Sequence, residues 1–282
     1  MRYGFVVPGG DPATVVGLAR EAEAAGWDGL FYPDGMVIPD GTGSGGSPWY
    51  DPWVVLAAVA VATSRIAIGP MLTPVSRRRP WKLARETVTL DHLSHGRLVL
   101  PVGLGAVETF GPFGEVADRK TRAELLDEGL EILVGLWSGE PFQHEGKHHR
   151  VGPVTFRPKP VQEPRIPIWV VGAWPSERSM RRPLRYDGLL PNKLGAEGAA
   201  GDLTPDDVRA MAAYVKEHRT ADGPFEIVLE GTTPGDDPAA ATATVRRWAE
   251  AGATWWLEAM WMAPNGPEEL LARVRQGPPR IG

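Results

Sequence analysis

The chain has 282 residues, of which 43% are hydrophobic and 23% are charged, and it carries a formal net charge of −5. This acidic balance gives no electrostatic basis for binding nucleic acid or an anionic membrane, so we expect neither as a partner. The chain contains no cysteine, which excludes disulfides, thiolate nucleophiles and cysteine-based metal sites.

The chain begins with MRYGFVVPGG, in which a short apolar run ends at Pro8. This run is too short for the apolar region of a signal peptide. No later segment approaches the roughly 20 consecutive apolar residues that a membrane-spanning helix needs. We therefore expect a soluble, cytoplasmic protein.

The first half of the chain alternates short apolar runs with amphipathic segments of helical length, a pattern typical of repeated strand–helix units. Asp11 followed by Pro12 predicts a helix N-terminus, and Gly26 predicts the end of that helix. Strands are predicted at 2–8, 29–34, 65–74 and 97–105, and helices at 12–25, 52–62, 80–93 and 120–137.

Residues 139–167 interrupt this alternation with Gly, Pro and His, and predict an inserted β-hairpin with a long return. Beyond the insertion the alternation resumes. Strands are predicted at 168–173, 187–192, 225–231 and 254–261, and helices from Ser176 onward and at 205–220, 238–251 and 267–274.

Eight strand-then-helix units over this length match an α/β fold, the (β/α)8 TIM barrel, as a single domain spanning residues 1–282. The insertion lies between the fourth helix and the fifth strand. A doubly wound open sheet is the structural alternative, but it usually has a Gly-rich phosphate turn after the first strand. The sequence VVPGGDP at that place lacks the required spacing, so the barrel is favoured.

In such a barrel the active site is built from the carboxyl ends of the strands and the loops that follow them. Several of these ends carry glycine, which lets a ligand approach the backbone closely. The aromatic residues Trp49, Trp174, Trp261, Phe110 and Phe113 are expected near the same mouth, and metal-binding clusters are absent there. This lining predicts a planar organic cofactor and no metal. The predicted strand ends are Pro8-Gly9, Asp34, Leu72-Thr73-Pro74, Gly103-Leu104-Gly105 with Glu108, Gly172-Ala173-Trp174, Asn192-Lys193, Glu230-Gly231 and Met260-Trp261.

Two features allow both a structural and a functional interpretation. Glu258 interrupts an apolar strand, and it is either a buried hydrogen-bonding group, which we favour, or a proton donor with a raised pKa. The segment HEGKHHR at 144–150 has three histidines and could imitate a metal site. It lies in the turn-rich insertion without a third well-placed acid, so a solvated hairpin is favoured.

A series of motifs occurs in a fixed order from Thr73 onward. They are Arg79-Pro80, Ala84-Arg85-Glu86, Leu90-Asp91-His92-Leu93-Ser94-His95-Gly96-Arg97 and Gly103-Leu104-Gly105, followed by PKPVQ at 158–162 and PIWVVG at 167–172. Together they resemble the bacterial luciferase-like monooxygenase superfamily of flavin- and deazaflavin-dependent oxidoreductases. The resemblance implies FMN or a deazaflavin coenzyme of the F420 type across the mouth of the barrel, and a small organic molecule as substrate.

The resemblance also implies roles for individual residues. Glu108 matches an acid found after the fourth strand in some deazaflavin-dependent dehydrogenases, and is the expected catalytic residue. Trp49, Phe110 and Trp261 are expected to shape the substrate side. The residues expected to bind the cofactor are Asp34 at the ring edge, Leu72 and Thr73 on the ring face, Gly103 and Leu104 beneath the ring or ribityl chain, and Gly172, Ala173, Trp174 and Ser176 at the phosphate.

The sequence departs from the family pattern at two places. Many members carry a histidine after the second strand, where this chain reads Pro33-Asp34-Gly35-Met36, and the usual Gly-Gly-Ser-type turn after the fifth strand reads Gly172-Ala173-Trp174-Pro175-Ser176. Three hypotheses therefore remain: an FMN-dependent monooxygenase, a deazaflavin-dependent reductase or dehydrogenase, and a barrel that binds a ligand or partner without redox turnover. The resemblance further suggests a homodimer.

Overall fold

The computed structural model describes residues 1–36, 50–107, 110–195, 200–261 and 267–281. Two of the predicted site residues, Trp49 and Glu108, lie outside the described residues. None of the helices in these ranges combines the length and the apolar character that a membrane span requires.

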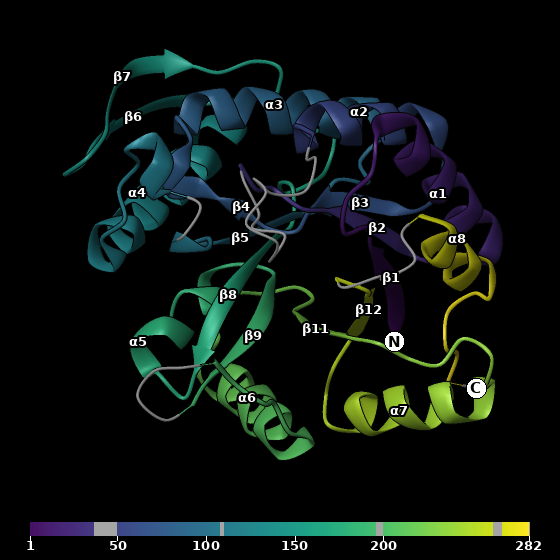
Figure 1. Ribbon diagram of the computed structural model, residues 1–282. Coiled ribbons are helices and arrows are strands. Elements are labelled where there is room, and N and C mark those ends of the chain that lie inside the picture. The colour runs from purple at the N-terminus through teal and green to yellow at the C-terminus, as the bar shows by residue number, and fades with distance from the viewer. Residues whose placement is uncertain (37–49, 108–109, 196–199, 262–266, 282) are drawn as a thin grey trace.

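A ten-stranded sheet forms the centre of the described molecule (Figure 1). Its eight longer strands run parallel, and neighbours follow the order β3-β2-β1-β12-β11-β9-β8-β5. Ile68 of β3 forms a parallel bridge with Leu98, just before β5, so the sheet closes on itself. The predicted (β/α)8 TIM barrel is therefore confirmed. The eight strands are β1 (Arg2–Val6), β2 (Gly29–Tyr32), β3 (Ala67–Pro70), β5 (Leu100–Gly103), β8 (Ile168–Trp174), β9 (Gly188–Leu194), β11 (Glu226–Gly231) and β12 (Trp255–Ala259).

Helices surround the strands on the outside of the barrel (Figure 1). The predicted first helix is confirmed with its cap, because the Asp11 carboxylate accepts backbone N–H groups of Ala13 and Thr14. The helices are α1 (Pro12–Ala25), α2 (Pro52–Ala62), α3 (Pro80–Leu93), α4 (Arg119–Trp137), α5 (Glu177–Met180), α6 (Pro205–His218), α7 (Pro238–Glu250) and α8 (Pro267–Arg275), with short 3-10 turns at Val75–Arg77, Gly111–Phe113 and Pro183–Arg185.

Two predicted elements are shorter than expected, and proline explains both. The strand predicted over 65–74 is divided into β3 and a two-residue β4 (Thr73–Pro74), and Pro70, which ends β3, has no N–H to continue the ladder. The helix predicted from Ser176 is the single turn α5. Arg182 keeps helical backbone, but Pro183 has no N–H to donate to the preceding turn, and the chain continues as the 3-10 turn Pro183–Arg185.

A two-stranded hairpin follows α4 and precedes β8 in the sequence, and it lies at the edge of the molecule beside α4 (Figure 1). It consists of β6 (Pro141–Glu145) and β7 (Arg150–Thr155). The Glu128 carboxylate of α4 accepts the backbone N–H groups of residues 147–149 at 2.8 to 3.1 Å and so fixes the turn. Across the described ranges, no group of three or more His, Cys, Asp or Glu side chains is arranged to hold a metal ion.

Aromatic rings fill the barrel interior below the site. The ring of Trp169 lies 5.5 Å from that of Phe31 and 5.3 Å from that of Trp255, between ring centroids. Met71 and Leu190 belong to the same buried cluster. They also line the cavity described below, so the apolar core of the barrel forms the floor of the site.

Candidate active-site cavity

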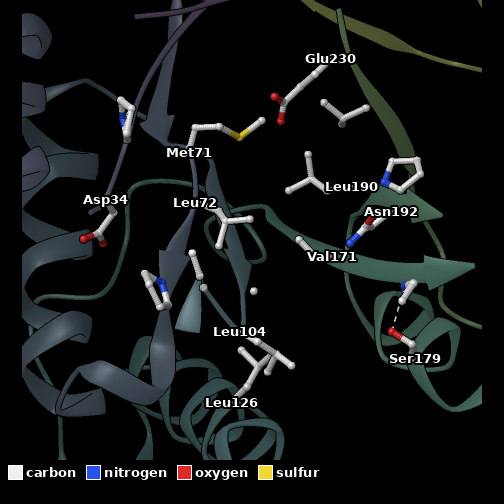
Figure 2. A pocket seen from close by; sticks show the side chains of 18 of the residues that line it. Asp34, Met71, Leu72, Leu104, Leu126, Val171, Ser179, Leu190, Asn192 and Glu230 are labelled. Carbon is white, nitrogen blue, oxygen red and sulfur yellow. Dashed lines mark hydrogen bonds between the residues drawn. The ribbon is translucent and has the colours of Figure 1, made fainter. Parts of the chain in front are cut away.

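A cavity of about 760 Å³ opens at the carboxyl ends of the barrel strands (Figure 2). Its volume lies within the range of about 300–1,000 Å³ that is typical of small-molecule sites. Six of the predicted site residues line it: Asp34, Leu72, Gly103, Leu104, Ala173 and Trp261. The sequence-based placement of the site at the strand ends therefore agrees with the cavity.

One wall of this cavity is apolar and depends on a glycine. Gly103 lies between Leu72 and Val171, and a Cβ added to it would be 3.0 Å from a methyl carbon of each. Contacts this short force neighbouring atoms to move, so only glycine keeps this part of the wall undistorted. Leu190 extends the same apolar lining from β9 (Figure 2).

Strand alternation along β8 divides the predicted phosphate-binding residues into two groups. Val171 and Ala173 line the cavity, whereas a Cβ at Gly172 would collide with Leu189 and Met180 on the helix side of the sheet. Trp174 also faces that side, and its ring centroid lies 6.2 Å from that of Tyr214 on α6. Successive side chains of a strand point to opposite faces. Trp174 therefore does not crowd the cavity.

Asp34 is held in a network of buried polar groups. Its carboxylate accepts Arg77 Nη2 at 2.7 Å, Arg78 Nη2 at 2.7 Å and the Thr73 hydroxyl at 3.0 Å. Thr73 is fully buried and does not line the cavity, so its side chain supports Asp34 instead of facing a ligand. The network fixes the end of β2 against the segment that follows β4.

The side of the cavity formed by α4 and α5 carries cationic and hydroxyl groups. Arg119 and Arg182 line it, and the Arg182 guanidinium donates to both Asp127 carboxylate oxygens at 2.6 and 2.9 Å. Ser179 lines it as well, and its hydroxyl accepts the backbone N–H of Ala173 at 2.9 Å (Figure 2). Ser176 does not line the cavity. Its hydroxyl caps the single turn of α5.

Glu230 reaches the cavity from the end of β11 (Figure 2). The Trp261 indole N–H donates to its Oε2 at 3.0 Å. The Glu230 side chain is exposed at the cavity surface, yet the protein atoms around it displace enough water to raise the pKa of its carboxyl, and the Trp261 hydrogen bond opposes that rise. The sequence predicts Glu230 at a strand end, with no role assigned to it. Its position directly after the apolar run at 227–229 was the available signal.

Phe110, predicted on the substrate side, is buried behind the cavity wall and does not line it. A Cβ added to Gly105 would lie 3.0 Å from its ring, so the ring packs directly beneath that glycine. The guanidinium carbons of Arg77 and Arg122 lie 5.8 and 5.1 Å from the ring centroid.

Glu258 takes the structural role that we favoured. It is fully buried, and its carboxylate accepts the backbone N–H and the hydroxyl of Thr233, each at 2.7 Å. Arg273 Nη2 donates to it at 3.2 Å, and the Trp256 indole N–H donates at 3.3 Å. These donors satisfy a carboxylate that an apolar strand could not accommodate alone.

Comparison with known protein families gives one match across nearly the whole chain. The profile of the family described as luciferase-like monooxygenase matches residues 3–276. An uncharacterized protein of Mycobacterium tuberculosis is 32% identical over 270 residues, which cover 90% of each chain. An F420-dependent glucose-6-phosphate dehydrogenase of Beutenbergia cavernae is 29% identical, over 93% of this chain and 83% of its own length.

Solved structures with the same fold include users of two cofactors. The F420-dependent tetrahydromethanopterin reductase of Methanopyrus kandleri has a TM-score of 0.75 at 17% identity, covering 98% of both chains. The oxygenating constituent of 3,6-diketocamphane monooxygenase from Pseudomonas putida, solved with FMN, has a TM-score of 0.71 at 17% identity, covering 98% of this chain and 96% of its own. At this level of identity the likeness shows the fold alone.

Proposed function

This chain belongs to the luciferase-like monooxygenase family, and we propose that it is an oxidoreductase that uses a deazaflavin coenzyme of the F420 type. When bound, such a coenzyme exchanges a hydride with a small organic substrate. The F420-dependent dehydrogenase that aligns with 93% of this chain supports this choice of cofactor.

The observation that carries the proposal is the division of the cavity into an apolar wall and a cationic side. Leu72, Gly103 and Val171 offer an apolar surface to a planar ring. Arg119 and Arg182 suit the other part of the coenzyme, because its tail carries a phosphodiester and carboxylates. The residues that line the cavity therefore fit the coenzyme in both shape and charge.

We assign the individual roles on the same basis. Leu104 and Ala173 join the apolar wall as ring contacts, and Ser179 joins the two arginines at the anionic tail. Asp34 fixes the rim through its ion pairs. Trp261 shapes the substrate side, and Trp49 and Glu108 keep the substrate-binding and catalytic roles that the family resemblance implies.

The open cavity favours an enzyme over a barrel without turnover. That alternative was motivated by Trp174, which could have blocked the phosphate position, and by the missing histidine. Trp174 packs on Tyr214 away from the cavity, which removes the first of these reasons. The missing histidine is compatible with catalysis where another acid supplies the proton.

We also propose a homodimer formed through the outer face of α2. This helix, PWVVLAAVAVA, has no charged residue, and its Val54 and Val61 are 69% and 70% exposed. An apolar helix face of this kind is costly to leave in water, and a second copy of the chain would cover it symmetrically. Sedimentation equilibrium of V61E against the wild type tests this, since a monomeric wild type would contradict it.

Equilibrium titrations with the oxidised deazaflavin coenzyme and with FMN, followed by fluorescence, test the proposed function. We expect binding of the deazaflavin to be at least tenfold tighter. Selective binding of FMN, together with oxygen uptake when the flavin is reduced, would overturn the proposal in favour of a monooxygenase. Binding of neither cofactor would favour the non-redox barrel.

A further inference from the structure

Two of the described carboxyl groups line the main cavity, and they differ in their ion-pair partners. The Asp34 side chain is 1% exposed and is paired with both Arg77 and Arg78. Glu230 forms no ion pair with a described residue and accepts one indole N–H from Trp261.

Glu230 also borders a second cavity. This side cavity has a volume of about 260 Å³ and shares five lining residues with the main one: Pro191, Asn192, Leu203, Leu229 and Glu230. Lys193, Asp202 and other polar groups line it. A polar cavity of this size holds several water molecules. Glu230 therefore lies between the main cavity and the side cavity, and water in the side cavity can supply or remove protons.

We propose that Glu230 is a proton donor and acceptor of the reaction, in addition to the catalytic Glu108 that the family resemblance implies, with its proton exchanged through the side cavity. Trp261 holds Oε2 in both protonation states, so that Oε1 is free to carry the proton toward the main cavity. This inference rests on the proposed function, because it assigns a residue to the redox reaction proposed there.

The proposed reaction is the reduction of a carbonyl substrate, with the reduced deazaflavin as the source of the hydride. The substrate carbon receives the hydride, and the carbonyl oxygen forms an O–H bond as the O–H bond of Glu230 breaks. The products are an alcohol, the oxidised coenzyme and the Glu230 carboxylate, which takes a proton from water in the side cavity. Oxidation of an alcohol is the same step reversed, with the carboxylate as base.

Several charged groups lie on the elements packed around Glu230. On its own strand, Glu226 lies at the opposite end and pairs with Arg2. Glu258 on the neighbouring strand β12 is paired with Arg273. The others are Lys193 with its partner Asp207 and Asp202 on the side cavity, and Arg119, Arg182 and Asp34 on the main cavity.

Infrared difference spectroscopy of the cofactor-free protein, titrated with pH, tests the proton-binding claim without turnover. We expect a carbonyl band from a protonated carboxyl that is lost in E230Q and retained in E226Q, the matched control at the far end of the same strand. In W261F the band should persist to higher pH, because the hydrogen bond that lowers the Glu230 pKa is removed. An identical titration in the wild type and E230Q would overturn the inference.

Kinetics supply the second readout. E230Q should lower kcat for carbonyl reduction by about 100-fold or more, as expected for loss of a general acid, with unchanged affinity for the coenzyme. In W261F the alkaline fall of kcat/KM should move to higher pH. A pH profile of E230Q that matches the wild type would contradict the inference. Absence of deazaflavin binding in the wild type would instead refute the proposed function, while the infrared titration would still decide whether Glu230 takes up a proton.

Discussion

Asp34 and Arg77 form a buried ion pair at the rim of the cavity, with Oδ1 and Nη2 2.7 Å apart and side chains that are 1% and 5% exposed. Arg78 makes a second contact of 2.7 Å with the same carboxylate oxygen. One carboxylate thus compensates two guanidinium groups. This arrangement locks the end of β2 to the segment after β4 and so fixes one edge of the site.

D34N should therefore destabilise the protein. Removing the carboxylate leaves the buried Arg77 without its ion-pair partner and leaves Arg78 only a 3.9 Å contact with Glu86. The expected loss is about 3–5 kcal/mol of the free energy of unfolding. Urea denaturation followed by circular dichroism measures it. The control D206N affects an exposed carboxylate paired with Arg209 and should change stability by less than about 1 kcal/mol. An equal loss of stability in D34N and D206N would refute the stabilising role of the buried ion pair.

G103A should weaken coenzyme binding. The new Cβ lies 3.0 Å from carbon atoms of Leu72 and Val171, so these side chains, which line the cavity, must shift. Overpacking of this kind costs about 1–3 kcal/mol, and about 1.4 kcal/mol corresponds to tenfold weaker binding. Fluorescence titration gives the dissociation constant.

G17A is the matched control for G103A. Gly17 lies on α1, where an added Cβ meets nothing within 4 Å. Alanine there should leave coenzyme binding unchanged and should not lower stability, because alanine is the better helix former. If G103A binds the coenzyme as tightly as G17A does, the apolar wall is not the ring-binding surface.

R273M should strongly destabilise the barrel, because it leaves the Glu258 carboxylate buried without its cation. The expected cost is about 3–5 kcal/mol, measured as a lower midpoint of urea denaturation. The double variant E258Q/R273M removes the charge as well, and should recover part of the loss. A double variant whose loss equals the sum of the two single losses would contradict a coupled ion pair.

Local signals explain why the helices were predicted well. The helices predicted at 12–25, 52–62 and 80–93 match α1, α2 and α3 at both ends. Each begins with proline, and the first two also have an aspartate that caps the backbone. Because these signals act within one turn of the chain, the sequence alone carries them. The single strand predicted over 65–74 was wrong, because proline interrupts the backbone hydrogen bonds of the sheet there.

The site could be predicted only in part, because it depends on the barrel register and on contacts between residues that are far apart in the sequence. Alternation along β8 assigns Val171 and Ala173 to the cavity, and Gly172 and Trp174 to the helix side, once the barrel register is known. Likewise, Arg182 reaches the cavity because Asp127, 55 residues earlier, holds it there. The raised pKa of Glu230 follows from partial desolvation by the surrounding protein atoms, and Trp261, 31 residues away, opposes the rise.

A crystal structure of the protein with the oxidised deazaflavin coenzyme tests the central claim most directly. We expect the ring to pack against Leu72, Gly103 and Val171. The anionic tail should lie toward Arg119 and Arg182. A coenzyme bound outside this cavity, or a ring directed toward the arginines with its tail on the apolar wall, would contradict the account.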